Sequence, residues 1–244
     1  MTQYRERLIL YIDILGFKDF IDKSNNDNQN YNRFIEFNES ITKALNIYPS
    51  IDIEINQKLI TLEYSSITQF SDSIIISINI LIVEQFEQLV LDVVNIICTG
   101  FHYGFIFRGA ITFGDIIHDS KNMFGPGFIR AYNIENKLAV FPRVVIDKRV
   151  YELPSLKMHT KILDKIVQED FDGVKYIEPF IGLHYKYSDE KIRQALIADV
   201  EKILEENTKH DDYTMQKYRW LENKLKQYKQ EHPTTGSSRF GARK

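Results

Sequence analysis

The chain has 244 residues, a net charge of −3, and 43% apolar residues. This length fits one large domain, or one domain with an appendage, and the apolar content is enough for a sizeable core. The near-neutral charge, with no basic stripe, argues against extended nucleic-acid binding, which depends on neutralising phosphates. The single cysteine, Cys98, excludes an internal disulfide and a thiolate metal cluster.

The apolar runs of this sequence are short. None approaches the roughly 18 residues of a membrane span, and the N-terminal run is interrupted by Asp13 and does not resemble a signal peptide. We therefore expect a cytoplasmic protein that has neither a membrane nor a nucleic acid as its partner.

Leu8–Ile12 is an almost unbroken apolar run, typical of a strand buried on both faces. It ends at Asp13, and a carboxylate at the end of a central strand lies at the mouth of the fold, where ligands bind. A lone buried carboxylate is costly unless it pairs or binds a metal. The alternative is that Asp13 only caps the following helix.

Residues 18–47 predict a helix interrupted by a polar loop at Ser24–Asn30. Leu59–Ile78 predicts two strands joined by a tight turn, with Asp72 at its tip, either as a plain turn residue or as a functional one. One face of the first of these strands carries Leu62, Tyr64, Ser66, Thr68 and Phe70.

Val83–Tyr103 predicts an amphipathic helix, and Phe105–Phe113 predicts another strand with Arg108 in its middle. A buried mid-strand arginine is costly unless it meets an anion, so Arg108 contacts either a structural carboxylate or an anionic ligand. Asp115–Asn122 predicts a polar hairpin loop.

A glycine-rich turn at Phe124–Gly127 precedes a predicted helix at 128–139, whose first turns carry Arg130 and Asn133. Such a turn offers backbone N–H groups that suit phosphate. Arg143–Asp147 predicts a short strand that follows this helix.

The remaining chain predicts helix over 148–165, a turn at Asp170–Gly173 between short strands, an extended stretch at Val174–Phe180, and two amphipathic helices at Lys191–Asn207 and Tyr213–Gln230. We divide the chain into a core at 1–150, strands and helices at 151–230 that cover the core or a dimer contact, and a flexible tail at 231–244.

The order strand, helix, hairpin, helix, strand predicts an α+β, ferredoxin-like split β-α-β fold with a mostly antiparallel sheet and a C-terminal helical extension. In this topology the first strand and the hairpin are neighbours, so Asp13 and Asp72 can meet. Two carboxylates that converge from separate elements are what a two-metal site for phosphoryl chemistry requires. Mg²⁺ or Mn²⁺ would take their oxygens together with those of a triphosphate.

Four segments, in this order, resemble the motifs of class III nucleotide cyclases. They are Tyr11–Phe17, Phe70–Ile74, Arg108–Asp115 and Gly125–Glu135. The likeness covers roughly residues 7–150 and is closest to the bacterial pyrimidine cyclases of Pycsar anti-phage defence, which make cyclic UMP or cyclic CMP. It implies the class III cyclase fold.

The resemblance also implies roles for individual residues. Asp13 and Asp72 would hold two divalent metal ions, Mn²⁺ or Mg²⁺, with the carbonyl of Ile14 as an added ligand. Arg108 would contact phosphate, and the N–H groups of Leu15 to Phe17 would contact the β- and γ-phosphates. The site would be shared across a head-to-tail homodimer, in which one subunit supplies the aspartates and the other the base pocket.

The chain departs from the purine cyclases at the base pocket. Where they carry a lysine or glutamate, this chain has Thr68, with Tyr64 further along the same face. A tyrosine can stack on or hydrogen-bond a smaller base, which favours a pyrimidine without choosing between UTP and CTP. The family's transition-state asparagine and arginine align with Ile129 and Asn133. Arg130 either replaces that arginine or is a solvated helical residue.

We therefore expect a nucleotide cyclase, with uridylate cyclase favoured, that converts UTP or CTP to its 3′,5′-cyclic monophosphate as an antiviral signal for a separate effector protein. One alternative is an inactive cyclase-like module that binds a nucleotide or a partner. The presence of both aspartates disfavours it. The other is a purine cyclase with an unusual pocket, which Thr68 disfavours.

Overall fold

The structure is a computed structural model that describes residues 3–24, 28–45, 51–55, 58–62, 65–79, 83–154, 161–207 and 212–233. Its main sheet runs in the order β4-β5-β1-β6-β8-β10-β9, with β7 paired to the end of β6. The strands are β1 (Arg5–Ile14), β4 (Ser65–Phe70), β5 (Ser73–Ile78), β6 (Phe107–His118), β7 (Met123–Phe124), β8 (Val144–Ile146), β9 (Val167–Glu169) and β10 (Lys175–Ile177). Two further strands, β2 (Ile51–Ile55) and β3 (Lys58–Leu62), pair with each other in a separate sheet.

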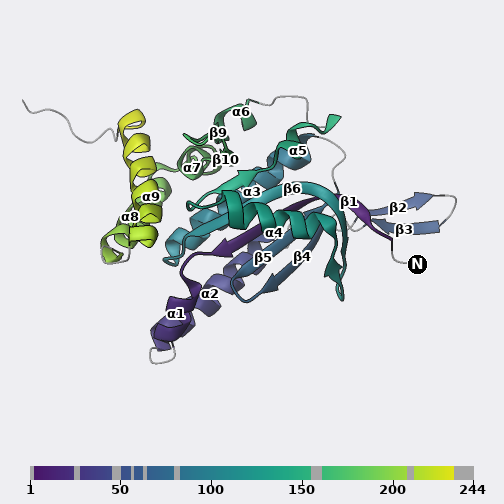
Figure 1. Cartoon of the computed structure of the whole chain (residues 1–244), viewed down its shortest axis with the longest axis horizontal. Helices are drawn as coiled ribbons and strands as arrows, with labels where there is room; N and C mark the ends of the chain where they lie inside the picture. The colour runs from purple at the N-terminus through teal and green to yellow at the C-terminus, as the bar shows by residue number, and fades with distance from the viewer. Residues whose placement is uncertain are drawn as a thin grey trace, which may run out of the picture.

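Helices cover both faces of the main sheet (Figure 1). They are α1 (Phe17–Ser24), α2 (Asn28–Leu45), α3 (Val83–His102), α4 (Pro126–Leu138), α5 (Lys148–Tyr151), α6 (Leu163–Ile166), α7 (Pro179–Lys186), α8 (Glu190–Glu206) and α9 (Asp212–Glu231). Helix α4 lies on one face, and α2 and α3 lie on the other (Figure 1). Among the described residues, no helix is both long enough and apolar enough to cross a membrane.

Strand β1 is the centre of the fold because it pairs with β5 on one side and β6 on the other, both antiparallel. Its alternate residues serve different layers, as the two-residue period of a strand requires. Leu8, Leu10 and Ile12 belong to the large core against α3, whereas Ile9 and Tyr11 belong to a smaller cluster beneath α4. Both faces of β1 are therefore buried, as the apolar run predicts.

The C-terminal helices are fixed to the sheet by a buried charged cluster. The guanidinium of Arg143, which is fully buried, pairs with Asp170 and with Asp172. The Asp170 carboxylate also accepts a hydrogen bond of 2.8 Å from Nε1 of Trp220 and lies 3.2 Å from Nζ of Lys224. Helix α9 is thereby tied to the turn between β9 and β10.

The predicted split β-α-β arrangement is confirmed, since β6, β1, β5 and β4 are neighbours in this order around the α1–α2 and α3 crossovers. The sheet is mostly antiparallel, and the pairing of β6 with β8 is parallel. The helical C-terminal part is also present. The division of the chain at 150 stays a prediction, and residues 234–244 of the predicted tail lie outside the described residues.

Two strand predictions are wrong. The segment Leu59–Ile78 holds three strands, because the apolar residues of β3 pair with β2 and do not continue into β4. Leu62 and Ser66 belong to different strands, and Tyr64 between them lies outside the described residues. Phe180 belongs to α7 rather than to an extended stretch, because Pro179 occupies the first turn of that helix and Glu178 caps it.

The limits predicted for the Arg108 strand and for the loop after it are also wrong. Arg108 is the second residue of β6, not its middle. The strand continues through Asp115 to His118, because β6 pairs with β1 as far as Arg5 and then with β7. The polar loop is reduced to Asp119–Asn122, where backbone N–H groups of the turn donate to the Asp119 carboxylate.

We predict that Asp170→Ala lowers the free energy of unfolding by about 3 kcal/mol or more, because it leaves part of a buried guanidinium and an indole N–H without an acceptor. Chemical denaturation measures this change. The matched control is Glu169→Ala, an exposed acidic neighbour, for which we expect a change within about 0.5 kcal/mol. Equal and small effects of both substitutions would show that the cluster does not hold α9.

Candidate functional site

Three neighbouring strands, β5, β1 and β6, carry polar residues at the same end of the sheet. The antiparallel registers place Asp13 of β1 opposite Ser73 of β5 on one side and opposite Arg108 of β6 on the other. Residues directly opposite each other in antiparallel strands project from the same face. The carboxylate of Asp13, the hydroxyl of Ser73 and the guanidinium of Arg108 therefore share the sheet face on which α4 lies.

The structure brings Asp13 and Asp72 together. Ser71 and Asp72 form the two-residue turn between β4 and β5, in which Ser71 adopts a left-handed φ of 56°. The N–H of Ile14 donates to the Asp72 carbonyl at 3.1 Å, and the hydroxyl of Ser73 donates to Oδ1 of Asp13 at 3.1 Å. The turn is thus tied directly to the end of β1.

The electrostatics of Asp13 reflect this arrangement. Burial raises the pKa of Asp13, and the nearby charge of Asp72 raises the pKa further, while Ser73 and Arg108 lower it. A divalent cation between the two carboxylates would relieve their repulsion, and carboxylate oxygens are the ligands that Mg²⁺ and Mn²⁺ prefer. The residues present therefore fit a divalent metal ion.

Protein atoms alone do not enclose such an ion. Within the part of the chain that the structure describes, no group of three or more His, Cys, Asp or Glu side chains could hold a metal. A cation bound to Asp13 and Asp72 would complete its coordination with water or with the oxygens of a ligand. The role of the Ile14 carbonyl as a ligand stays a prediction.

Arg108 lies between two carboxylates. Its Nη2 is 3.6 Å from Oδ2 of Asp13, and its Nε is 2.5 Å from Oε1 of Glu135 on α4. Glu135 is 1% exposed, and burial raises its pKa to about 7, with Arg108 opposing that rise and Asp13 adding to it. Arg108 pairs with a structural carboxylate, and its side chain keeps 21% of its exposure, so an anionic ligand can also contact it.

Sequence reasoning did not assign a role to Glu135. The signal that could have found it is its place on the buried stripe of α4, which otherwise carries Gly127, Ala131 and Ile134. A glutamate on such a stripe needs a partner under the helix. The nearest strand of the sheet supplies Arg108.

The structure does not bring Arg130 and Asn133 to Asp13. Arg130 forms a bidentate pair with Asp147, with Nε to Oδ2 at 2.5 Å and Nη2 to Oδ1 at 2.9 Å. Thr112 donates to the same carboxylate. Arg130 is therefore not the solvated helical arginine of the sequence-based alternative. Asn133 is exposed on α4, two residues and about 200° of helical rotation from Glu135.

Gly127, in the first turn of α4, allows close packing of the helix on the sheet. A Cβ atom at Gly127 would lie 2.5 Å from Cδ1 of Ile9 and 2.9 Å from the carbonyl carbon of Gly114. Pro126 has no N–H, so it cannot donate to a phosphate. This turn brings α4 against β1 and β6, and the geometry gives a phosphate role little support.

The first turn of α1 lies beside the two aspartates. The N–H of Leu15 donates to the carbonyl of Ile106 at 2.9 Å, which removes Leu15 from the predicted phosphate-binding amides. Phe17 begins α1, where N–H groups have no partner within the helix and favour anions. Leu15 and Gly16 also line a cavity of about 340 Å³.

This cavity lies between the N-terminal helices and the C-terminal extension. It is bounded by α1, α2, α8 and α9, and its charged lining residues are the cations Lys23, Arg33 and Lys217 and the acids Asp19 and Glu206. Lys217 also lowers the pKa of Glu135 through its charge, so α9 reaches close to the Arg108 pair. The surroundings of the α1 N-terminus thus combine helix amides with cationic side chains.

Of the two predicted base-pocket residues, the structure describes Thr68 and not Tyr64. Thr68 lies on the same sheet face as Asp13, since it is opposite Ile75, which is opposite Tyr11. Its hydroxyl contacts Nε2 of His118 at 2.9 Å. Tyr64 lies outside the described residues.

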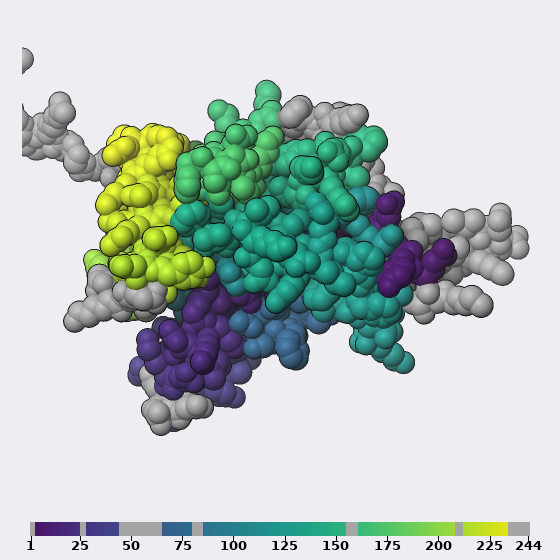
Figure 2. Space-filling model, viewed as in Figure 1, coloured from purple at the N-terminus to yellow at the C-terminus, as the bar shows by residue number. Residues whose placement is uncertain are grey.

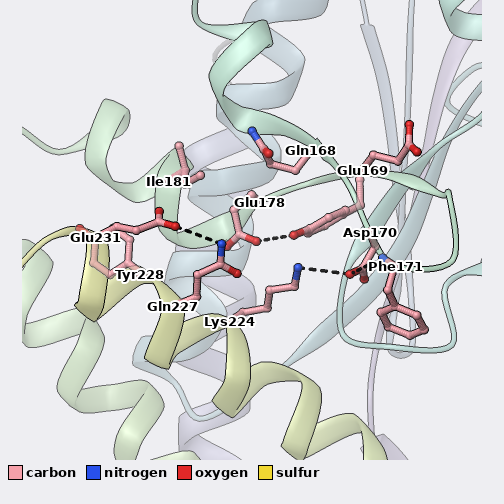
Figure 3. A pocket seen from close by; sticks show the side chains of 11 residues that line it. Gln168, Glu169, Asp170, Phe171, Glu178, Ile181, Lys224, Gln227, Tyr228 and Glu231 are labelled. Atoms are coloured by element: carbon pink, nitrogen blue, oxygen red, sulfur yellow. Dashed lines mark hydrogen bonds and ion pairs between the residues drawn. The ribbon is translucent and has the colours of Figure 1, made fainter.

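A second cavity, of about 220 Å³, lies beside the buried charged cluster of α9 (Figure 3). Its polar groups are engaged with each other. Asp170 lies near Lys224, and Glu178 accepts a hydrogen bond of 2.6 Å from the hydroxyl of Tyr176. We assign this cavity to the structural attachment of α9.

Searches for similar proteins gave matches among solved structures only. No protein-family model matches the chain, and no curated protein matches it. A bacterial light-regulated adenylyl cyclase shows 14% identity and a TM-score of 0.46, with 81% of this chain and 99% of that one covered. An adenylate/guanylate cyclase/hydrolase from Silicibacter pomeroyi shows 13% identity and a TM-score of 0.41, with 72% of this chain and 95% of that one covered.

A third solved structure is the monomeric guanylyl cyclase domain of the RhoGC fusion protein from the aquatic fungus Blastocladiella emersonii. It shows 12% identity and a TM-score of 0.46, and the match covers 72% of this chain and 98% of that chain. Each of these is a distant likeness between folds.

We predict that His118 makes the protein less stable as the pH falls from about 6.5 to about 4. Burial, then the charge of Arg7, lowers the pKa of His118 to about 4, while Asp119 raises it slightly. Between these pH values His118 binds a proton in the unfolded chain but stays neutral in the folded chain. Acidification therefore lowers the free energy of unfolding, by about 3 kcal/mol in total.

The measurement is the free energy of unfolding of the wild type and of His118→Gln at several pH values. The wild type should lose about 3 kcal/mol more than the variant between pH 7 and pH 4. Parallel curves for the wild type and His118→Gln would show that His118 titrates normally in the folded chain.

Proposed function

We propose that the chain is a nucleotide cyclase that converts a pyrimidine nucleoside triphosphate, UTP in preference to CTP, to its 3′,5′-cyclic monophosphate. The observation that carries this proposal is the convergence of Asp13 and Asp72 at one sheet edge beside Arg108. The order of sequence segments that resembles class III cyclases supports it, because the same two aspartates and the same arginine occupy those segments.

The proposed reaction is an intramolecular displacement at the α-phosphorus. The ribose 3′-oxygen loses its proton to solvent and forms a bond to the α-phosphorus, and the bond from that phosphorus to the bridging oxygen of pyrophosphate breaks. The products are the cyclic monophosphate and pyrophosphate. Two divalent cations, Mn²⁺ or Mg²⁺, held by Asp13 and Asp72 with the Ile14 carbonyl, would lower the pKa of the 3′-hydroxyl and neutralise the leaving pyrophosphate.

The remaining groups would bind and orient the triphosphate. Arg108 would give a charge-assisted hydrogen bond to a phosphate oxygen, with Glu135 fixing the direction of its guanidinium from below. The first N–H groups of α1, from Phe17 on, would donate to the β- and γ-phosphates. Three cations and two acids line the adjacent cavity, and this small excess of positive charge would favour the negative charge of that end of the nucleotide.

We further propose that the site is completed in a homodimer. Beside α4, the half of the sheet formed by β4 and β5 (blue) reaches the surface on the face shown in Figure 2. Phe70, at the end of β4, is 76% exposed, and Ile129 and Tyr132 on α4 are 59% and 48% exposed. A second copy on this face would cover these apolar side chains and place Asn133 or Thr68 against the partner's nucleotide.

The pyrimidine preference rests on Thr68. A threonine lacks the charge that a purine-reading lysine or glutamate supplies. Thr68 lies opposite Ile75 and its hydroxyl contacts His118, so it can offer a base a hydrogen bond but not an ion pair. We propose that the cyclic nucleotide acts in the cytoplasm as an antiviral second messenger that a separate effector protein detects. This part of the proposal rests on the resemblance to the pyrimidine cyclases.

A second candidate is an inactive cyclase-like module that binds a nucleotide or a partner protein. The observation that favours it is the pairing of Arg130 with Asp147, which leaves the transition-state position of α4 without its arginine. Retention of Asp13 and Asp72 favours the enzyme.

The purified full chain, incubated with each of the four nucleoside triphosphates and Mn²⁺, should release cyclic UMP, and cyclic CMP more slowly. Asp72→Ala should reduce turnover roughly 1000-fold or more, because a catalytic cation supplies several kcal/mol of transition-state stabilisation. Circular dichroism checks that the variant folds, and Asp22→Ala, an exposed acid of α1, is the matched control.

The outcomes separate the candidates. Nucleotide binding without any product supports the inactive module, and cyclic AMP or cyclic GMP as the main product contradicts the pyrimidine preference. Full activity of Asp72→Ala would remove the two-carboxylate mechanism.

A further inference from the structure

Five polar side chains form one hydrogen-bonded network across four strands, which extends from Arg7 near the start of β1 to Thr68, level with Tyr11 in the sheet. Its members are Arg7 of β1, Ser66 and Thr68 of β4, Ser77 of β5 and His118 of β6. Arg7, Ser77 and His118 are buried, whereas Ser66 and Thr68 of β4 are partly exposed. Ser66 already accepts from Arg7 and donates to the carbonyl of His118, so Thr68 is the member left to contact a ligand on this face.

The direction of the hydrogen bonds follows from which groups can only donate. Arg7 Nη1 donates to Oγ of Ser77 at 3.0 Å and to Oγ of Ser66 at 2.9 Å. The hydroxyl of Ser66 donates to the backbone carbonyl of His118 at 2.7 Å. Ser77, which is fully buried, needs an acceptor for its hydroxyl proton, and Nδ1 of His118 lies 2.9 Å away.

This direction selects one form of the imidazole. If Ser77 donates to Nδ1, the ring proton of neutral His118 is on Nε2, and Nε2–H donates to Oγ1 of Thr68 at 2.9 Å. The Thr68 hydroxyl then accepts from the ring and keeps its own proton for a partner outside the network. Burial and the charge of Arg7 lower the pKa of His118, with only Asp119 opposing them, so the ring is neutral at pH 7.

We propose that this network, from Arg7 through Ser77 and His118, presents Thr68 to the nucleotide base as a hydrogen-bond donor. A donor selects the 4-carbonyl of uracil over the 4-amino group of cytosine, since an amino group has no acceptor to offer. In the opposite tautomer, the Thr68 hydroxyl would donate to the unprotonated Nε2 of His118. It could then only accept a hydrogen bond from the base, which would favour the 4-amino group of cytosine. The inference rests on the proposed function, because it requires a pyrimidine base on this sheet face.

The tautomer can be measured without any nucleotide. In the full-length protein, two-bond and three-bond ¹H–¹⁵N correlations from the carbon-bound ring protons give separate ¹⁵N shifts for Nδ1 and Nε2 of His118. We expect a protonated Nε2 and an unprotonated Nδ1 at pH 7. Ser77→Ala should shift population toward the Nδ1–H form, while Thr42→Val, on the exposed side of α2, should leave the shifts unchanged. A wild type with the proton on Nδ1 would overturn the inference.

The base preference is tested with α,β-methylene analogues of UTP and CTP, which bind but cannot lose pyrophosphate. Calorimetric titration of the wild type in Mn²⁺ should give an affinity for the UTP analogue roughly 10-fold or more above that for the CTP analogue. Thr68→Val, which keeps the shape and removes the hydroxyl, should bring the two affinities within about 3-fold of each other. Thr42→Val should keep the wild-type ratio.

The two failures are distinguishable. If the wild type binds both analogues equally, or Thr68→Val keeps the full preference, the inference is wrong and the cyclase proposal is untouched. If the wild type binds neither analogue and turns over no nucleotide, the proposed function fails and the reading of a base by Thr68 fails with it. In that case the tautomer measurement still decides the direction of the network.

Discussion

The antiparallel pairing of β1 with β5 is the constraint on which the candidate site depends. Its register, from Leu8 with Ile78 to Asp13 with Ser73, fixes the end of β1 beside the turn that carries Asp72. A shift of one residue would send Asp13 to the opposite face, because side chains alternate along a strand. Packing opposes such a shift, because it would exchange the residues of β1 that pack in the large core with those that pack beneath α4, and it would turn the Asp13 carboxylate toward the apolar core. The core and the carboxylate pair are thus specified by the same pattern.

The charges at this edge form a connected set rather than isolated pairs. Arg108 contacts both Asp13 and Glu135, and Glu135 in turn is influenced by Lys217 of α9. The buried pair of Arg143 and Asp170 holds α9 in place from the other side of the extension. The C-terminal helices therefore contribute to the electrostatics of the site as well as covering the sheet. If Asp13 bound a cation, its carboxylate would interact less strongly with Arg108. The guanidinium could then contact an anion more readily.

The sequence predicted those features of the fold that depend on period and order. The buried run of β1, the helix α3 and the split β-α-β arrangement follow from apolar spacing, and so does the meeting of Asp13 with Asp72. The limits of β3 and β6 were wrong, because strand pairing with β2, β1 and β7 decides where those strands begin and end. Glu135, His118 and the partner of Arg130 could not be predicted, because each makes its contacts with residues distant in sequence whose approach depends on tertiary packing.

The proposed function requires that Asp13 and Asp72 bind the same divalent cations. Titration of the full chain with Mn²⁺, followed by electron paramagnetic resonance of the free ion, measures this in the wild type, Asp13→Asn, Asp72→Asn and the double variant. We expect each single variant to lose about 10-fold or more in affinity and the double variant to lose little further, since both carboxylates bind the same cations. Asp115→Asn, an exposed acid of β6, should bind as the wild type does. Wild-type affinity in both single variants, or losses that add as for two independent sites, would contradict joint binding by Asp13 and Asp72.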